Sequence, residues 1–124
     1  MRGFLVVLVL AGSCAGCGGD SAPAGPGAEH WAKALRDPDA RVRRKAALKL
    51  GNLGPADPSA LPALIGALKD RDAGVRCEAI LALVKFGRAA REAVPALEGA
   101  RKDADARVRS YATRALAAIR GDDG

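Results

Sequence analysis

Apolar residues recur three and four positions apart through most of residues 28–120, with polar residues between them. In the middle of the chain, SALPALIGALK (59–69) and AGVRCEAILALVKF (73–86) each carry such a stripe, and each predicts an amphipathic helix. The first stripe consists of Leu61, Leu64, Ile65 and Leu68. The second consists of Val75, Ala79, Leu83 and Phe86, widened by Ile80 and Val84. A face that wide predicts a helix that is covered on more than one side.

Polar and conformationally special residues mark the ends of these helices. Ser59 is predicted to cap the first helix, and Pro62 falls in its first turn, where a missing N–H is tolerated. Asp72 is placed to cap the second helix. Gly87 is predicted to end it, as Gly54 ends the equivalent helix earlier in the chain.

The same pattern returns at a fixed period of 33 residues, in RDPDARVR (36–43), DRDAGVR (70–76) and DADARVR (103–109). The aligned apolar columns include Val42, Val75 and Val108, Ala46, Ala79 and Ala112, and Leu50, Leu83 and Leu116. A period of this size predicts an all-α fold, an α-solenoid of three stacked helix pairs. The first helix of the first unit, AEHWAKALR (28–36), is short and has Glu29 where the others have proline, while Trp31 and Leu35 keep its core positions.

Each unit repeats two aspartates and an arginine at the turn between its helices. The second aspartate is predicted to cap the following helix, and the arginine lies one turn inside that helix. We expect this arginine to reach the first aspartate of its own or the adjacent unit. The six predicted inter-repeat residues are Asp37, Arg43, Asp70, Arg76, Asp103 and Arg109. We expect these pairs to be exposed and to contribute roughly 0–1 kcal/mol each, so that most of the stability comes from the apolar stripes.

Taken together, these positions resemble the HEAT repeat: a proline, an aspartate eight residues later, then Val-Arg five and six residues further on, as in Pro62, Asp70, Val75 and Arg76. The DxDxxVR turn is most similar to the HEAT-like repeats of phycobilisome lyases, and the resemblance covers residues 28–120. It implies a scaffold fold that hosts many functions. It also implies that the second helices line the concave side, which gives the candidate partner surface Arg44, Lys45, Lys49, Glu78, Lys85, Tyr111 and Arg114.

The N-terminus has the pattern of an export signal. In MRGFLVVLVLAGSCAGCGGD (1–20), Arg2 precedes an apolar run over 4–11 and a stretch of small residues, which predicts a signal peptide over residues 1–16. The apolar run is shorter than the about 20 residues that span a bilayer. AGC (15–17) resembles a bacterial lipobox, so Cys17 is the predicted lipid attachment residue, with Cys14 as the alternative. An ordinary cleaved signal and a disulfide are the other interpretations.

Residues 17–27 are rich in Gly, Pro and Ala and are predicted to form a flexible linker before the repeat domain of residues 28–120. Residues 121–124 form a short C-terminal tail. A thioredoxin-like redox pair at CAGC (14–17) is disfavoured, because that motif follows a strand and opens a helix.

Charge and catalytic residue types narrow the function classes. The chain has 20 Lys and Arg against 14 Asp and Glu, but the signs are mixed and only RVRRK (41–45) is a tight basic cluster, which favours a solvated surface over nucleic-acid binding. His30 is the only histidine, so no catalytic set, metal site or cofactor is predicted. Cys77 shares its column with Arg44 and Ser110 and is expected to be partly exposed.

The sequence therefore predicts a lipid-anchored, non-enzymatic protein-interaction scaffold of the bacterial envelope, with an unidentified protein partner and no nucleic acid. One alternative is a structural protein that self-associates, with Ala115 and Ala118 of the last helix facing a second copy. The other is a lyase-like HEAT accessory factor.

Overall fold

The computed structural model describes residues 27–121. The predicted signal peptide, the linker up to residue 26, both candidate lipid attachment cysteines Cys14 and Cys17, and residues 122–124 lie outside the described residues. The described chain contains six α-helices and two 3-10 turns. In order they are α2 (Ala28–Ala34), α3 (Ala40–Leu53), η2 (Gly54–Ala56), α4 (Ala60–Ala67), α5 (Ala73–Phe86), η3 (Gly87–Ala93), α6 (Val94–Ala100) and α7 (Ala106–Arg120).

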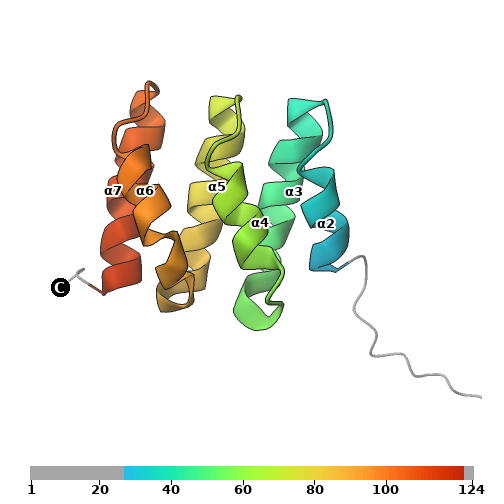
Figure 1. Cartoon of the computed structure of the whole chain (residues 1–124), viewed down its shortest axis with the longest axis horizontal. Helices are drawn as coiled ribbons and strands as arrows, with labels where there is room; N and C mark the ends of the chain where they lie inside the picture. Colours follow the sequence, from blue (N-terminus) through green and yellow to red (C-terminus); the bar gives the residue numbers. More distant parts are fainter. Residues whose placement is uncertain (1–26, 122–124) are drawn as a thin grey trace, which may run out of the picture.

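The helices form three pairs, α2 with α3, α4 with α5, and α6 with α7, which stack side by side in two layers (Figure 1). The first helices of the pairs make one layer and the second helices make the other. Helix α5 contacts both α3 and α7, so it occupies the middle of the second layer. The prediction of an all-α solenoid of three helix pairs is confirmed, and the part of the chain that the structure describes contains no strand.

Aspartates begin all three second helices, as predicted for Asp72. The Asp72 carboxylate accepts a hydrogen bond from the backbone N–H of Val75 at 3.0 Å. Asp39 accepts from the N–H of Arg41 at 2.8 Å, and Asp105 does the same for Arg107. Each carboxylate accepts a hydrogen bond from a backbone N–H that has no partner within the helix. Its negative charge also interacts favourably with the positive end of the helix dipole.

Glycines end α3 and α5, as the sequence predicts. Gly54 and Gly87 have φ angles of +74° and +56°, a left-handed region in which a Cβ is unfavourable. Ser59 is the N-cap residue of α4, as predicted, but its side chain makes no capping hydrogen bond to the helix. Its hydroxyl and its backbone N–H both donate to the Asp57 carboxylate, at 2.7 and 3.0 Å, so Asp57 organises this turn.

The core follows the predicted stripes and centres on α5. Val75, Ala79, Ile80 and Leu83 are fully buried, and Phe86 is nearly so. Val84 is only half-buried. Trp31 and Leu35 of the short first helix are half-buried and pack against the core. No described helix has the length and apolar character needed to cross a membrane.

Helices α3 and α5 approach each other closely at Gly51. A Cβ added there would lie 2.7 Å from the Cβ and 2.9 Å from the Cα of Ala82. Because one of these atoms is backbone, an alanine at position 51 forces the two helices apart. We expect Gly51→Ala to lower the free energy of unfolding by about 1–3 kcal/mol, as overpacking does in other cores.

Chemical denaturation followed by circular dichroism measures this effect. Gly66→Ala is the matched control, because Gly66 is also inside a helix but a Cβ there meets nothing within 4 Å. We expect this control to be neutral or stabilising, since alanine has the higher helix propensity. Equal destabilisation by both substitutions would contradict the close-packing argument.

Candidate interaction surface

The repeated arginines link one unit to the next through largely buried ion pairs. Arg43 donates from Nε to Asp70 Oδ2 at 2.8 Å and from Nη2 to Asp70 Oδ1 at 3.1 Å, a bidentate contact between the first and second units. Its Nη1 donates to the carbonyls of Asp37 and Pro38 in its own turn. The Arg43 side chain is only 4% exposed and that of Asp70 11%. The expectation of exposed pairs is therefore wrong for this link.

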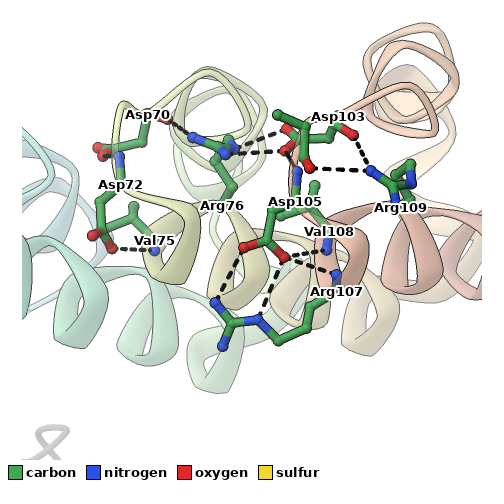
Figure 2. A network of polar contacts seen from close by, with 10 residues as sticks. Asp70, Asp72, Val75, Arg76, Asp103, Asp105, Arg107, Val108 and Arg109 are labelled. Carbon is green, nitrogen blue, oxygen red and sulfur yellow. Dashed lines mark hydrogen bonds and ion pairs between the residues drawn. The ribbon is translucent and has the colours of Figure 1, made fainter.

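Arg76 makes the equivalent link between the second and third units (Figure 2). Its Nη2 donates to Asp103 Oδ1 at 3.0 Å, and its Nε lies 2.9 Å from Asp103 Oδ2. Its Nη1 donates to the carbonyl of Asp70 at 2.7 Å. The side chains of Arg76 and Asp103 are 16% and 14% exposed, so this pair is also shielded from water. Each arginine thus joins its own turn to the turn of the following unit.

The end members of the two columns do not link units within the described chain. Asp37 accepts only the backbone N–H of Asp39, at 2.8 Å, and receives no arginine from another unit. Arg109 is exposed and donates to the carbonyls of Asp103 and Ala104 in its own turn (Figure 2). The prediction that they tie units together is wrong for these two residues, because no further unit precedes Asp37 or follows Arg109 in the described stack.

Two of the capping aspartates, Asp39 and Asp105, have arginine neighbours that favour their ionised form. Hydrogen bonds from the Arg107 side chain, and then from its backbone N–H, lower the pKa of the Asp105 carboxyl (Figure 2). Arg41 lowers the pKa of Asp39 in the same way. A lowered pKa in the folded state means that the stabilising contribution is present above the ordinary carboxyl pKa. It is lost as the pH falls through the folded-state value.

The candidate partner residues lie on α3, α5 and α7, and none is buried. Helical spacing together with the 33-residue period arranges this surface in rows that cross the three helices. We call it the second-helix face. Its three central rows are Lys45, Glu78 and Tyr111; Leu48, Leu81 and Arg114; and Asn52, Lys85 and Ala118.

Sequence reasoning missed the two leucines of the middle row. Leu48 is 42% exposed and Leu81 is 37% exposed, although both belong to helices that carry a wide apolar stripe. They lie at equivalent positions of neighbouring helices, and the third member of their column is Arg114. Arg114 was the signal in the sequence that could have revealed the exposure of these leucines. A charged residue in an aligned column indicates that the column faces solvent.

Most of the charged groups on the second-helix face are basic and have no described carboxylate as a partner. Lys45, Lys49, Lys85 and Arg114 form no ion pair among residues 27–121. Lys85 instead donates to Asn52 Oδ1 at 2.7 Å. The Lys45 ammonium lies 6.0 Å from the Trp31 ring centre and the Arg114 guanidinium 5.7 Å from that of Tyr111, which are cation–π distances.

A small cavity of about 170 Å³ opens on the same face, between α3, α5 and α7. Arg44, Cys77, Glu78, Leu81, Arg107 and Tyr111 line it. Arg44 crosses from α3 toward α5, where its guanidinium approaches Gly74 and lies 3.9 Å from the Asp72 carboxylate.

Cys77 lies at this cavity but is 7% exposed, so the expectation of a partly exposed thiol is wrong. Burial raises the pKa of the Cys77 thiol, which lowers the fraction of reactive thiolate. In a Cys14→Ser, Cys17→Ser chain, where Cys77 is the only thiol, we expect the folded protein to react with Ellman's reagent at least tenfold more slowly than the chain in denaturant. Equal rates would contradict the burial of this side chain.

The opposite, first-helix layer carries two grooves that repeat at the 33-residue period. One, of about 340 Å³, lies between α2 and α4 and is lined by Leu35, Pro62, Gly66 and Asp70 among others. The other, of about 640 Å³, lies between α4 and α6 and is lined by the equivalent Leu68, Pro95, Gly99 and Asp103. Asp70 and Asp103 are already paired with Arg43 and Arg76, so these grooves are features of the stacking.

Within residues 27–121, no group of three metal-ligating side chains comes together. His30 is exposed and makes an edge-on contact with the Trp31 ring, with 4.8 Å between ring centres. Ala115 is fully buried and Ala118 half-buried, so the expectation that both face a second copy is wrong for Ala115.

The stacked helix pairs, the inter-unit arginines and an open face on the second helices define the class of helical-repeat solenoid proteins. A family model described as HEAT repeats matches residues 28–121, and the chain belongs to that family.

Solved structures similar to this chain include the following two. One is in the complex of CpcE and CpcF of phycocyanin lyase from Nostoc sp. PCC7120, at 29% identity and a TM-score of 0.69, with 87% of this chain and 42% of that chain covered. The other is an engineered protein, at 26% identity and a TM-score of 0.60, with 74% of this chain and 44% of that chain covered. The chain thus spans less than half the length of either structure. A search of curated protein sequences finds no match.

Proposed function

We propose that this chain is a non-enzymatic protein-interaction scaffold of the bacterial envelope that holds its partner on the second-helix face. The observation that carries the proposal is the pair Leu48 and Leu81, which are exposed at equivalent positions of neighbouring helices in a surface that is mostly polar. Exposed apolar side chains with a charged surround are typical of protein interfaces. The similar Nostoc structure is itself a complex of two proteins, which agrees with this use of the fold.

Photo-crosslinking in cells tests the scaffold function. A photoreactive amino acid at position 81 is expected to give one discrete crosslinked product, whereas the same group at Gly66 on the first-helix layer is expected to give none. The crosslinked protein is then purified and its binding to the full chain is measured directly. The absence of any position-81 product, or equal products from both positions, would contradict the proposal.

We also propose that Cys17 carries a lipid that holds the protein at a membrane, with residues 18–27 as a tether. The support is the sequence alone: Arg2, the apolar run, and AGC at 15–17. Labelling cells with a clickable fatty acid tests it. Label is expected in the wild type and in Cys14→Ser, and it is expected to disappear in Cys17→Ser. Loss only in Cys14→Ser moves the anchor by three residues, and no label in any of the three overturns the proposal.

A further inference from the structure

We propose that the second-helix face binds an acidic, amphipathic helical segment of a partner protein, with the apolar side of that helix on Leu48 and Leu81 and its carboxylates on the surrounding lysines and arginines. This inference rests on the proposed scaffold function and adds the chemistry of the partner. The charges of the face, its apolar row and its geometry support the same kind of partner.

The charges point to an acidic partner. Lys45, Lys49, Lys85 and Arg114 have no described carboxylate partner, and Glu78 is the one carboxylate in the three central rows. The nearby Asp39, Asp72 and Asp105 are occupied, since each accepts a helix N–H and has an arginine close by. The face therefore presents positive charge that its own residues do not neutralise, which favours and steers a negatively charged partner.

The apolar row points to a protein segment among the possible anions. Leu48 and Leu81 expose hydrocarbon, and the cavity beside Leu81, at about 170 Å³, has room for one aliphatic side chain. A phosphate backbone or a lipid headgroup gains nothing from covering leucine, whereas an apolar side chain of a protein segment removes hydrocarbon from water when it packs there. The cavity wall includes Cys77 and Tyr111 together with the charged residues Arg44, Glu78 and Arg107.

The spacing of the row suits a helix that crosses α3 and α5. Packed helices lie about 8–10 Å apart, so the two leucines of the row are separated by about that distance. In an α-helix, residues seven positions apart lie on one face and about 10 Å apart. A partner helix with apolar residues at i and i+7 therefore contacts both leucines. Acidic residues beside them then face Lys45 on one side of the row and Lys85 on the other.

A defined peptide tests this chemistry on the full chain. The probe is a labelled helical peptide with two leucines seven residues apart and glutamates at the flanking positions, and fluorescence anisotropy measures its dissociation constant. Two control peptides keep the length: one replaces the glutamates by lysines and the other replaces the leucines by serines. We expect the acidic probe to bind at least tenfold more tightly than either control, and its affinity to fall as salt rises.

Variants of the chain locate the site. Lys45→Glu with Lys85→Glu is expected to weaken the probe at least tenfold. The control Lys69→Glu with Lys102→Glu makes the same change in net charge at exposed lysines of the first-helix layer, and we expect less than a twofold effect. Leu81→Ser is expected to weaken binding at least fivefold, and because this leucine is already 37% exposed, the variant keeps its core. Circular dichroism checks that each variant is folded.

Several results would overturn the inference: equal binding of the leucine and serine peptides, equal loss in the two charge-reversed variants, or no binding of the acidic probe. Tighter binding of single-stranded nucleic acid or anionic vesicles than of the probe, abolished by Lys45→Glu with Lys85→Glu, would also overturn it. The proposed function is tested separately. If the crosslink from position 81 forms and the acidic probe does not compete with it, the proposed scaffold function stands. Only the inference that the partner is acidic is then contradicted.

Discussion

Replacing Arg76 by methionine is expected to lower the free energy of unfolding by about 2–4 kcal/mol. The substitution keeps most of the aliphatic side chain but removes the guanidinium that contacts Asp103 and the carbonyl of Asp70. The Asp103 carboxylate, which is 14% exposed, then loses its ion-pair partner. Removing one partner of a shielded pair is strongly destabilising, because the remaining charge stays buried without compensation. Urea denaturation followed by circular dichroism measures the loss.

Arg109→Met is the matched control. Arg109 occupies the same column and also bonds the carbonyl of its own turn, but it is exposed and has no described carboxylate partner. We expect this control to cost less than about 1 kcal/mol. In the Arg76→Met, Asp103→Asn double variant, part of the loss is expected to return, since the stranded charge is gone. Equal effects of the two arginine substitutions would show that the contact with Asp103 contributes nothing.

The fold could be predicted from the sequence because the same helix-capping, helix-ending and apolar residues recur in the repeated units. Asp72 caps a helix, Gly87 ends it, and the apolar stripe between them has helical spacing. The 33-residue period then fixes how the pairs stack. Residues 73–86 were predicted as a helix, and the structure has a helix with those bounds.

Burial of individual polar residues could not be predicted from the columns. Cys77 was expected to resemble Arg44 and Ser110, which share its column. The long side chain of Arg44 extends across to Gly74 of α5 and stays 51% exposed, whereas the short thiol of Cys77 is buried. Ser110 is exposed because no described unit follows it. One column thus contains three environments, set by side-chain length and by position in the stack.

The exposure of the candidate interaction surface was predicted in part. The basic residues were placed on the second helices, where the structure has them exposed, but Leu48 and Leu81 were not recognised. Helical spacing places an apolar residue relative to its own helix and does not say whether a neighbouring helix covers it. Leu81 and Leu83 lie in the same helix, two residues apart, yet one is 37% exposed and the other is fully buried.

That contrast supplies the prediction with the largest effect. Leu83→Ala is expected to lower the free energy of unfolding by about 3–5 kcal/mol, because it removes a fully buried side chain and leaves a cavity. Helix α5 packs on α3, α4 and α7, so little can move into the space. A domain of about 95 residues is stable by roughly 5–14 kcal/mol, so this loss is a large share of the total. Thermal and urea denaturation measure it.

Leu81→Ala is the control on the same helix, with the same chemical change at an exposed position, and it is expected to cost less than about 1 kcal/mol. Leu50→Ala and Leu116→Ala test the solenoid itself, since they occupy the same column in α3 and α7, where units pack on one side only. In a stack stabilised by neighbour contacts, both are expected to cost less than Leu83→Ala. If Leu116→Ala lowers the free energy of unfolding more than Leu83→Ala does, the third unit and not the middle one contributes most to the stability of the stack.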